Sequence, residues 1–421
     1  MKLTPEEHSI LDGQQGEPLQ ALMELLVQYG EDCGAEQLVP IEGQPHLENS
    51  SCSSQDQTFN HIFKQASAAG LQSLEPFTVN PRPPGFGTFK AGLAGRLSAA
   101  LTYRQQTPFE NQLKAMGLKD DNAFTCACYL PETGNIPQRG APLAWSEISA
   151  VAFANSVLGA RSNRTPAGID LLCAILGKVP LFGLLTETGR QASWKVGIAT
   201  SRLPDPQVLG SAIGLKTNGQ VPYIVGLDAH LGPGRSLRAD DYLKDMGAAT
   251  ASSGVMLYHV ENITPEAVEK RQDILNKSHQ TYLVDDNELQ NILDNLPAPK
   301  QPKMVFIGCP HLSIHQIADW TTRIEETLKT AGKSKAGLPT YLFAGPDVIA
   351  AFQQNAPAAH QRLMAMSVQL SPTCPLLYLE TPTASRRAIA TNARKLCGGT
   401  AGQFFQDDTL LHIIAAGRLP R

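Results

Sequence analysis

The chain has 421 residues, 42% of them hydrophobic and 18% charged, which is the composition of an ordinary globular protein with about two or three domains. Its net charge of −4, without a long run of lysine or arginine, argues against nucleic acid as a partner. Because no stretch reaches ~18 apolar residues and the N-terminus lacks the apolar core of a secretory signal, we expect a cytoplasmic protein with no membrane partner.

The first half of the chain carries clear helix signals separated by irregular segments. Thr4-Pro5-Glu6-Glu7 combines a capping residue, a proline at the first helical position and acids in the first turn. Leucines on one face predict a second helix from Pro18 to Tyr29. The polar segment 42–57 and the proline- and glycine-rich segment 80–87 predict loops. Apolar residues then recur at helical spacing from Pro142 to Leu158.

The middle of the chain contains two short apolar runs, 221–227 and 255–260, which predict buried strands. Thr264-Pro265-Glu266 follows the second run and predicts another helix start. The proline-rich stretch 295–302 is the best candidate for a linker.

Strand and helix alternate regularly after this linker. The predicted order is strand 304–307, helix 313–328, strand 340–343, helix 347–364 and strand 368–370. Such an alternation is typical of a parallel sheet covered on both faces. We therefore predict an α/β protein with several domains and mainly parallel sheets. The expected division is an N-terminal region 1–210, a central region 211–298 and a C-terminal domain 303–421.

The eight cysteines are scattered through the chain, and most are expected to be buried structural thiols. Cys126, Cys309 and Cys374 differ because turn-forming residues flank them, which suits metal or iron–sulfur ligands. No Cys-x-x-Cys pair is present, so three unrelated loop cysteines remain an alternative, as does zinc. Cys128 competes with Cys126 for the same role.

Three segments could bind an anionic substrate. The stretch from Asn155 to Arg164 contains amide, hydroxyl and guanidinium groups that suit a carboxylate, although a solvated helix end would look the same. Ser252 and Ser253 could present backbone N–H groups to an anion or form an ordinary tight turn. His311 lies beside Cys309 and is either a site residue or a hydrogen-bonded structural histidine.

Several of these segments, in this order, resemble motifs of the aconitase X family. The resembling segments are Leu3–Glu7, Phe77–Pro81, Trp145-Ser146-Glu147 leading into Asn155–Arg164, Ala251–Gly254, Thr264–Ala267 and Gly308–His311. The resemblance extends from the first residues to about residue 400 and implies an aconitase-like fold whose α/β domains surround a central cluster site.

The resemblance also implies an activity, that of a hydro-lyase. Cys126, Cys309 and Cys374 match the positions that hold an iron–sulfur cluster, [4Fe-4S] or [2Fe-2S]. Lys395 and Ser156 are the matching candidates for catalysis. The candidates for substrate binding are Asn155, Ser156, Arg161, Asn163, Arg164, Ser252, Ser253 and His311.

The segment Cys126–Pro137 looks most similar to family members that dehydrate cis-3-hydroxy-L-proline, which gives 1-pyrroline-2-carboxylate. The alternatives are the large subunit of a phosphomevalonate dehydratase and a cluster-free binding or regulatory subunit. The family also requires a small swivelling domain, which we expect as a separate small subunit. Ala393 stands where the family usually has serine.

Overall fold

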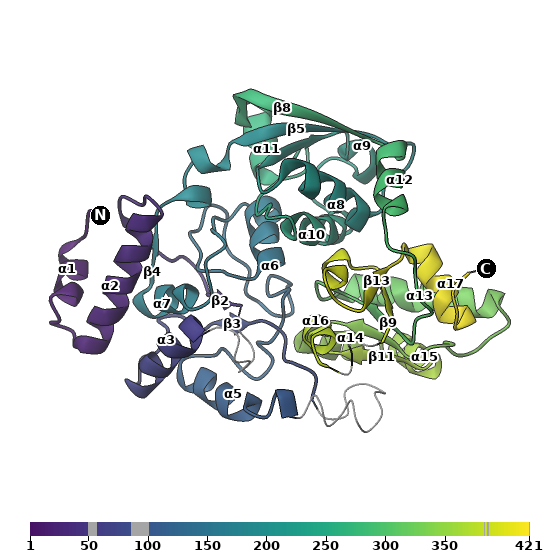
Figure 1. The fold of residues 1–421 in the computed structure, drawn as a ribbon, viewed down its shortest axis with the longest axis horizontal. Helices are drawn as coiled ribbons and strands as arrows, with labels where there is room; N and C mark the ends of the chain where they lie inside the picture. Colours follow the sequence, from purple (N-terminus) through teal and green to yellow (C-terminus); the bar gives the residue numbers. More distant parts are fainter. Residues whose placement is uncertain (49–56, 86–100, 383, 385–386, 421) are drawn as a thin grey trace.

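The computed structural model describes residues 1–48, 57–85, 101–382, 384 and 387–420. In this described part the chain forms an N-terminal, a central and a C-terminal region. Figure 1 shows them from purple, through teal, to yellow. No helix in the described residues is both long and apolar enough to span a bilayer.

The N-terminal region is mainly helical, with short strands and long loops. Its elements are α1 (Pro5–Leu11), α2 (Glu17–Asp32), β1 (Leu38–Pro40), β2 (His46–Leu47), α3 (Gln57–Ala68), β3 (Thr78–Val79), α5 (Gln106–Ala115), α6 (Ile148–Phe153), the π-helical turn η1 (Ala154–Leu158), α7 (Ile169–Leu176), β4 (Lys178–Pro180), η2 (Gly183–Leu185) and η3 (Thr188–Arg190). The first predicted helix is confirmed, because Thr4 and Glu7 form a capping box. Parts of both predicted loops, 49–56 and 86–87, lie outside the described residues.

The helix predicted from Pro142 begins later than expected. Pro142 pairs with Arg161 in an isolated bridge, and the helix starts only after Glu147, whose carboxylate caps it. The helix then continues into the π-helical turn η1, which ends at Gly159 in the left-handed conformation, φ 73°. The helix predicted from the spacing of apolar residues is confirmed for the second half of the segment and wrong for the first half.

The central region is a four-stranded parallel sheet with order β7-β6-β5-β8. Its elements are β5 (Ala192–Ala199), α8 (Pro206–Thr217), β6 (Pro222–Val225), α9 (Asp228–Leu231), α10 (Leu237–Ala251), β7 (His259–Val260), α11 (Pro265–Lys270), η4 (Arg271–Ile274), β8 (Leu275–Asp285) and α12 (Asp286–Asp294). Only the last two residues of the predicted strand 255–260 pair with β6. The predicted boundary at residue 210 falls inside α8, so we place the division near residue 190.

The C-terminal region is a five-stranded parallel sheet with order β11-β10-β9-β12-β13. Its elements are β9 (Met304–Ile307), α13 (Ile314–Thr330), β10 (Thr340–Phe343), α14 (Pro346–Asn355), α15 (Pro357–Ala365), β11 (Val368–Ser371), α16 (Pro375–Leu379), β12 (Ile389–Thr391), η5 (Arg394–Cys397), β13 (Gly402–Phe404) and α17 (Asp407–Ala416). The predicted alternation is confirmed. The single helix predicted at 347–364 is divided at Ala356, because Pro357 has no N–H to continue it.

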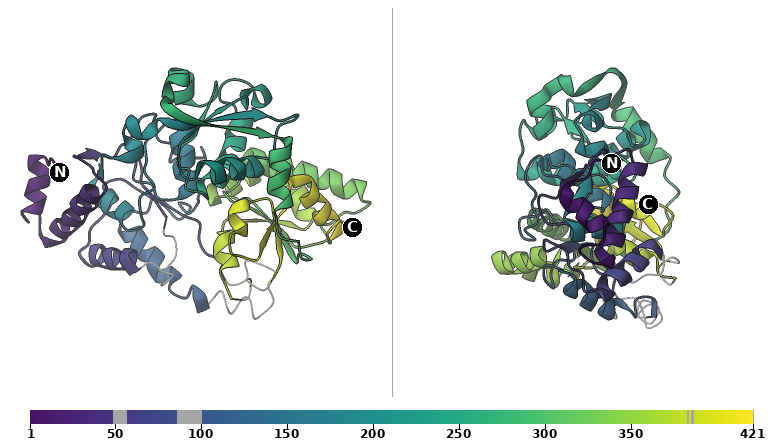
Figure 2. Two further views of the ribbon diagram at one scale, coloured as in Figure 1. Left: turned by 45° about the horizontal axis from the view of Figure 1, so that its top comes forward. Right: turned by 90° about the vertical axis from the view of Figure 1, so that its left-hand side faces the viewer.

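The three regions pack together around one apolar cluster. Trp145, Leu243 and Ile317 are buried members of this cluster and come from the N-terminal, central and C-terminal regions. Helix α10 packs against both α6 and α8. Figures 1 and 2 show α6 near the middle of the molecule, where the regions meet. Loops from different regions can therefore converge on a common site.

Candidate active site

Cys309 and Cys374 both follow strands of the C-terminal sheet. Cys309 comes two residues after β9, and Cys374 comes three residues after β11, at the N-cap of α16. The carboxyl ends of parallel strands lie at one edge of a sheet, where such folds commonly bind ligands. Arg82 of the N-terminal region joins this edge, because its carbonyl accepts a hydrogen bond from the Cys374 N–H at 2.8 Å.

His311 connects the loops that carry these cysteines to the loop that carries Cys126. Its backbone N–H donates to the Cys126 Sγ at 3.3 Å. Its ring lies 3.0 Å from the Thr125 hydroxyl through Nδ1 and 3.4 Å from the Thr373 carbonyl through Nε2. Burial lowers the pKa of His311 to about 4, so the ring is neutral near pH 7. Both ring nitrogens have partners, which favours the structural interpretation of this histidine.

The three cysteines are half-buried, and their thiols lie close enough to influence one another. Burial raises the pKa of Cys126 to about 12 and also raises the pKa values of Cys309 and Cys374. The charges of Cys126 and Cys374 add to the effect on Cys309, whereas Lys395 opposes it. A bound metal would stabilise the thiolates that burial disfavours.

The chemistry of the three cysteines suits an iron–sulfur cluster. Thiolates are the ligands that hold such clusters, and Cys126, Cys309 and Cys374 supply three of them. Within the described residues, no three His, Cys, Asp or Glu side chains are placed to hold one metal ion.

The half-buried Lys395 and the buried Glu147 form an ion pair beside the thiols. Lys395 Nζ lies 2.6 Å from Glu147 Oε1, while Glu147 Oε2 accepts hydrogen bonds from the Ser149 hydroxyl and the Ala150 N–H, each at 2.6 Å. Burial alone would lower the pKa of Lys395, but Glu147 and Cys309 outweigh it and raise the pKa. Burial alone would raise the pKa of Glu147, but the effect of Lys395 and of the hydrogen bonds is larger, so the pKa lies below its ordinary value. Both groups are therefore charged near pH 7.

A second carboxylate and a second cation stand near this pair. Burial, reinforced by the charge of Glu147, raises the pKa of Glu48 to about 7, while Arg164 and Lys395 act in the opposite direction. The Glu48 N–H donates to the Ser146 hydroxyl at 2.7 Å, which fixes the backbone at this point. Arg164 is exposed and has no hydrogen bond or ion pair in the described part of the chain. A carboxylate that titrates near pH 7 and an unpaired guanidinium are useful groups for acid–base chemistry and anion binding.

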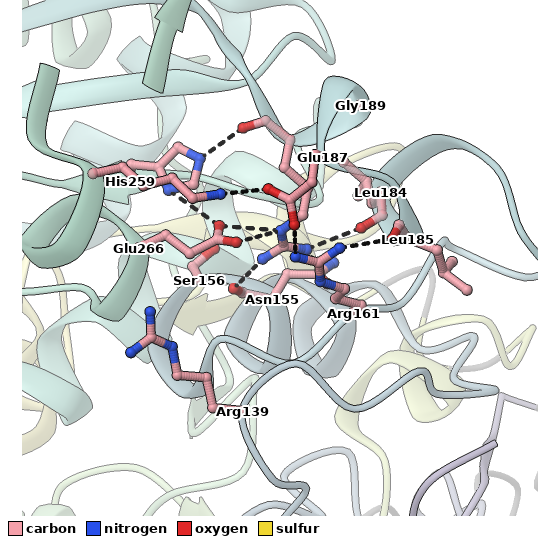
Figure 3. A network of polar contacts seen from close by, with 12 residues as sticks. Arg139, Asn155, Ser156, Arg161, Leu184, Leu185, Glu187, Gly189, His259 and Glu266 are labelled. Carbon is pink, nitrogen blue, oxygen red and sulfur yellow. Dashed lines mark hydrogen bonds and ion pairs between the residues drawn. The ribbon is translucent and has the colours of Figure 1, made fainter. Parts of the chain in front are cut away.

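The other predicted residues of the Asn155–Arg164 segment bond to other parts of the chain, and Figure 3 shows Asn155, Ser156 and Arg161 among their neighbours. Arg161 pairs with Glu187 and donates to the Leu185 carbonyl. Asn163 bonds the Phe182 carbonyl and the Leu184 N–H. Asn155 and Ser156 bond the central region, as described below. Of this segment, only Arg164 has a charged group without a partner among the residues that the structure describes.

Ser252 and Ser253 lie at the C-terminal end of α10. The Ser252 hydroxyl donates to the Ala248 carbonyl at 3.0 Å, and the Ser253 side chain would meet any side chain added at Gly214. A helix C-terminus presents carbonyl oxygens and a partial negative charge, which disfavours an anion. The structure therefore gives no support to the predicted anion site at these serines.

Parallel α/β regions that converge on three half-buried cysteines define an aconitase-like fold. Residues 1–188 match the family model described as "Aconitase X first domain", and residues 191–294 match "Aconitase X second domain". The chain belongs to the aconitase X family, and it is a dehydratase, a hydro-lyase, of that family. The predicted family, fold class and enzyme class are confirmed.

Similar curated proteins carry two different names. The phosphomevalonate dehydratase large subunit of Thermococcus kodakarensis is 32% identical over 79% of this chain and 78% of its own length. The protein of the same name from Methanothermobacter thermautotrophicus is 33% identical over 74% of each chain. A cis-3-hydroxy-L-proline dehydratase of Hypocrea jecorina is 27% identical over 75% of this chain and 52% of its own length.

A solved structure covers the whole chain. The crystal structure of Thermococcus kodakaraensis aconitase X, in its holo form, superposes with a TM-score of 0.81 at 27% identity. The match covers 100% of both chains. It supports the arrangement of all the regions described above, including the C-terminal sheet that the two family models do not reach.

Proposed function

We propose that this chain is the large, cluster-bearing subunit of an iron–sulfur-dependent dehydratase acting on a small hydroxy acid. The observation that carries the proposal is the convergence of Cys126, Cys309 and Cys374 beside the half-buried Lys395–Glu147 pair. The three cysteines would hold the cluster. When bound, an iron–sulfur cluster with an open iron supplies a Lewis acid for the departing hydroxyl group.

The side chains of this subunit would bind the substrate and move its proton. Arg164 is placed to pair with a carboxylate, because its guanidinium is exposed and has no partner in the described residues. Lys395 is a fixed ammonium that can stabilise negative charge as it develops. We assign the proton abstraction to Glu48, whose pKa of about 7 suits a general base.

A separate small subunit is the expected partner. The relatives with about a third of identical residues are named large subunits, which implies a second chain. We propose that this chain completes the active site together with such a subunit. Nothing in the charge or composition points to nucleic acid as a further partner.

Phosphomevalonate is the first substrate to test, ahead of the cis-3-hydroxy-L-proline that we preferred from the sequence. Relatives named phosphomevalonate dehydratase are 30–33% identical over about three quarters of this chain. Hydroxyproline stays the second candidate because of the local charge. In the described residues, Arg164 and Lys395 are balanced by Glu48 and Glu147, which suits a zwitterion better than a phosphate monoester.

The two substrates can be compared directly with enzyme co-expressed with its small subunit and handled without oxygen. Each compound is incubated with the iron-loaded enzyme, and the loss of one water is followed by mass spectrometry. Conversion of phosphomevalonate alone would assign the chain to that reaction, and conversion of hydroxyproline alone to the other. An iron-loaded enzyme that dehydrates neither compound would contradict both assignments.

Arg164 and Arg161 provide a matched pair for testing substrate binding. We expect Arg164→Gln to raise KM by about 10- to 100-fold, since one charge-assisted hydrogen bond to the substrate is lost. Arg161→Gln should leave KM within about threefold, because its guanidinium already pairs with Glu187. Steady-state kinetics of both variants check this. Equal effects of the two substitutions would refute the assignment to Arg164.

A further inference from the structure

Arg190 is a buried arginine at the junction of the N-terminal and central regions. It lies between the two family-model segments, which end at residue 188 and begin at residue 191, and it is 1% exposed. Its Nε donates to both carboxylate oxygens of Glu266 in α11, at 2.9 and 3.0 Å. The other two nitrogens of the guanidinium contact the N-terminal region. One side chain therefore bonds both regions.

The contacts with the N-terminal region converge on Asn155. Arg190 Nη2 donates to the Asn155 carbonyl at 2.9 Å, and Nη1 lies 3.2 Å from the Asn155 side-chain oxygen. Nη1 also donates to the Leu184 carbonyl at 3.1 Å. Figure 3 shows Asn155, Leu184 and Glu266 gathered in this network. Asn155 is only 1% exposed, so these bonds form out of contact with water.

The π-helical turn η1 also bonds directly to the central region. The Asn155 amide donates to the Met256 carbonyl at 2.9 Å, and the Ser156 hydroxyl accepts from the Tyr258 N–H at 2.9 Å. His259, the next residue, lies 3.0 Å from the Arg190 carbonyl through Nε2. The Asn-Ser pair that is prominent in the sequence thus serves the junction between the two regions.

Helix α6 connects this junction to the ion pair at the active site. The helix begins at its cap Glu147 and runs without interruption into η1, which ends at Leu158, so Glu147 and Asn155 lie about two turns apart in one short helical unit. The residues from Ser149 to Val157 are all buried. Such a packed unit moves as a whole, because a close-packed interior does not deform locally without cost.

We propose that Arg190 is a positioning residue, which anchors α6 through Asn155 and thereby holds Glu147 in register with Lys395. The catalytic part of this inference rests on the proposed function. Helix α6 also packs against α10, so the competing explanation is that Arg190 only stabilises the fold. The two explanations differ in whether the loss of Arg190 loosens Glu147 at the N-terminal end of α6.

The Ala150 N–H reports the state of Glu147, because it donates to the Glu147 carboxylate. Hydrogen exchange of this segment is measured on the full chain with its small subunit, for wild type, Arg190→Gln, Asn155→Ala and the control Arg139→Gln. Arg139 forms an exposed ion pair with Glu269 across the same two regions. We expect exchange at residues 148–151 to accelerate by at least about tenfold in Arg190→Gln and Asn155→Ala and to stay unchanged in the control Arg139→Gln.

The kinetic signature should be a fall in kcat with KM changed less than about threefold, since Arg164 is untouched. Arg190→Lys keeps the positive charge but supplies one nitrogen in place of the three that contact Glu266, Leu184 and Asn155, and it therefore serves if Arg190→Gln does not fold. Wild-type protection of residues 148–151 in a folded Arg190 variant would overturn the proposal. The exchange result does not depend on turnover, so a wrong substrate assignment would affect only the kinetic result.

Discussion

Replacing Glu48 with glutamine is expected to lower kcat/KM by about 10²- to 10⁴-fold, the usual contribution of a general base. Glutamine keeps the size of the side chain but cannot accept the proton. The control is Glu42→Gln, which changes an exposed carboxylate six residues earlier in the same segment and should leave the rate unchanged. A Glu48→Gln enzyme with the wild-type rate would contradict the assignment of the base.

The pH dependence gives a second test of Glu48. Its pKa of about 7 means that the carboxylate form, which is the competent base, becomes populated as the pH rises through 7. We therefore expect kcat/KM of the wild type to rise between about pH 6 and 8 and then level off. The residual activity of Glu48→Gln should lack this rise. A profile that falls with pH over the same range would mean that the essential group is an acid.

Replacing Lys395 with methionine should reduce kcat by about 10²- to 10³-fold, because a fixed positive charge beside the reacting groups is removed. Lys395→Arg retains the charge and should recover part of the rate. Lys395→Met also leaves the buried Glu147 carboxylate without its charged partner, which lowers the stability of the fold. The double variant Lys395→Met, Glu147→Gln removes both charges and separates the two effects. If the double variant has the Tm of wild type but stays inactive, the loss of activity comes from the missing charge and not from a loss of stability.

The fold could be predicted where each strand is a single apolar run. Strands β9 and β10 are buried along their length and β11 is buried at both ends, and the sequence alone located them within one or two residues. Strand β8 was missed because most of its residues are partly exposed and polar, so no apolar run marks it. The helix break at Ala356 could have been predicted, because Pro357 stands in the segment.

The site was only partly predictable. Prolines and glycines beside Cys309 and Cys374 were a local signal, whereas Cys126 was assigned from the family resemblance. The structure brings the three thiols close enough to influence one another. Glu147 and Glu48 were missed, because their importance comes from burial and from Lys395 and Arg164, which are distant in sequence. Conversely, Asn155 and Ser156 were prominent in the sequence, yet their polar atoms bond Met256 and Tyr258.

The most direct test of the cluster mechanism is the iron and sulfide content of the protein, purified without oxygen together with its small subunit. We expect stoichiometric iron and sulfide with a visible absorption band, and the loss of both in Cys126→Ser, Cys309→Ser or Cys374→Ser. The matched control is Cys128→Ser, a buried thiol beside Thr78, which should keep the cluster. Iron-free protein that cannot be reconstituted, or equal iron loss in the Cys128 variant, would contradict the account.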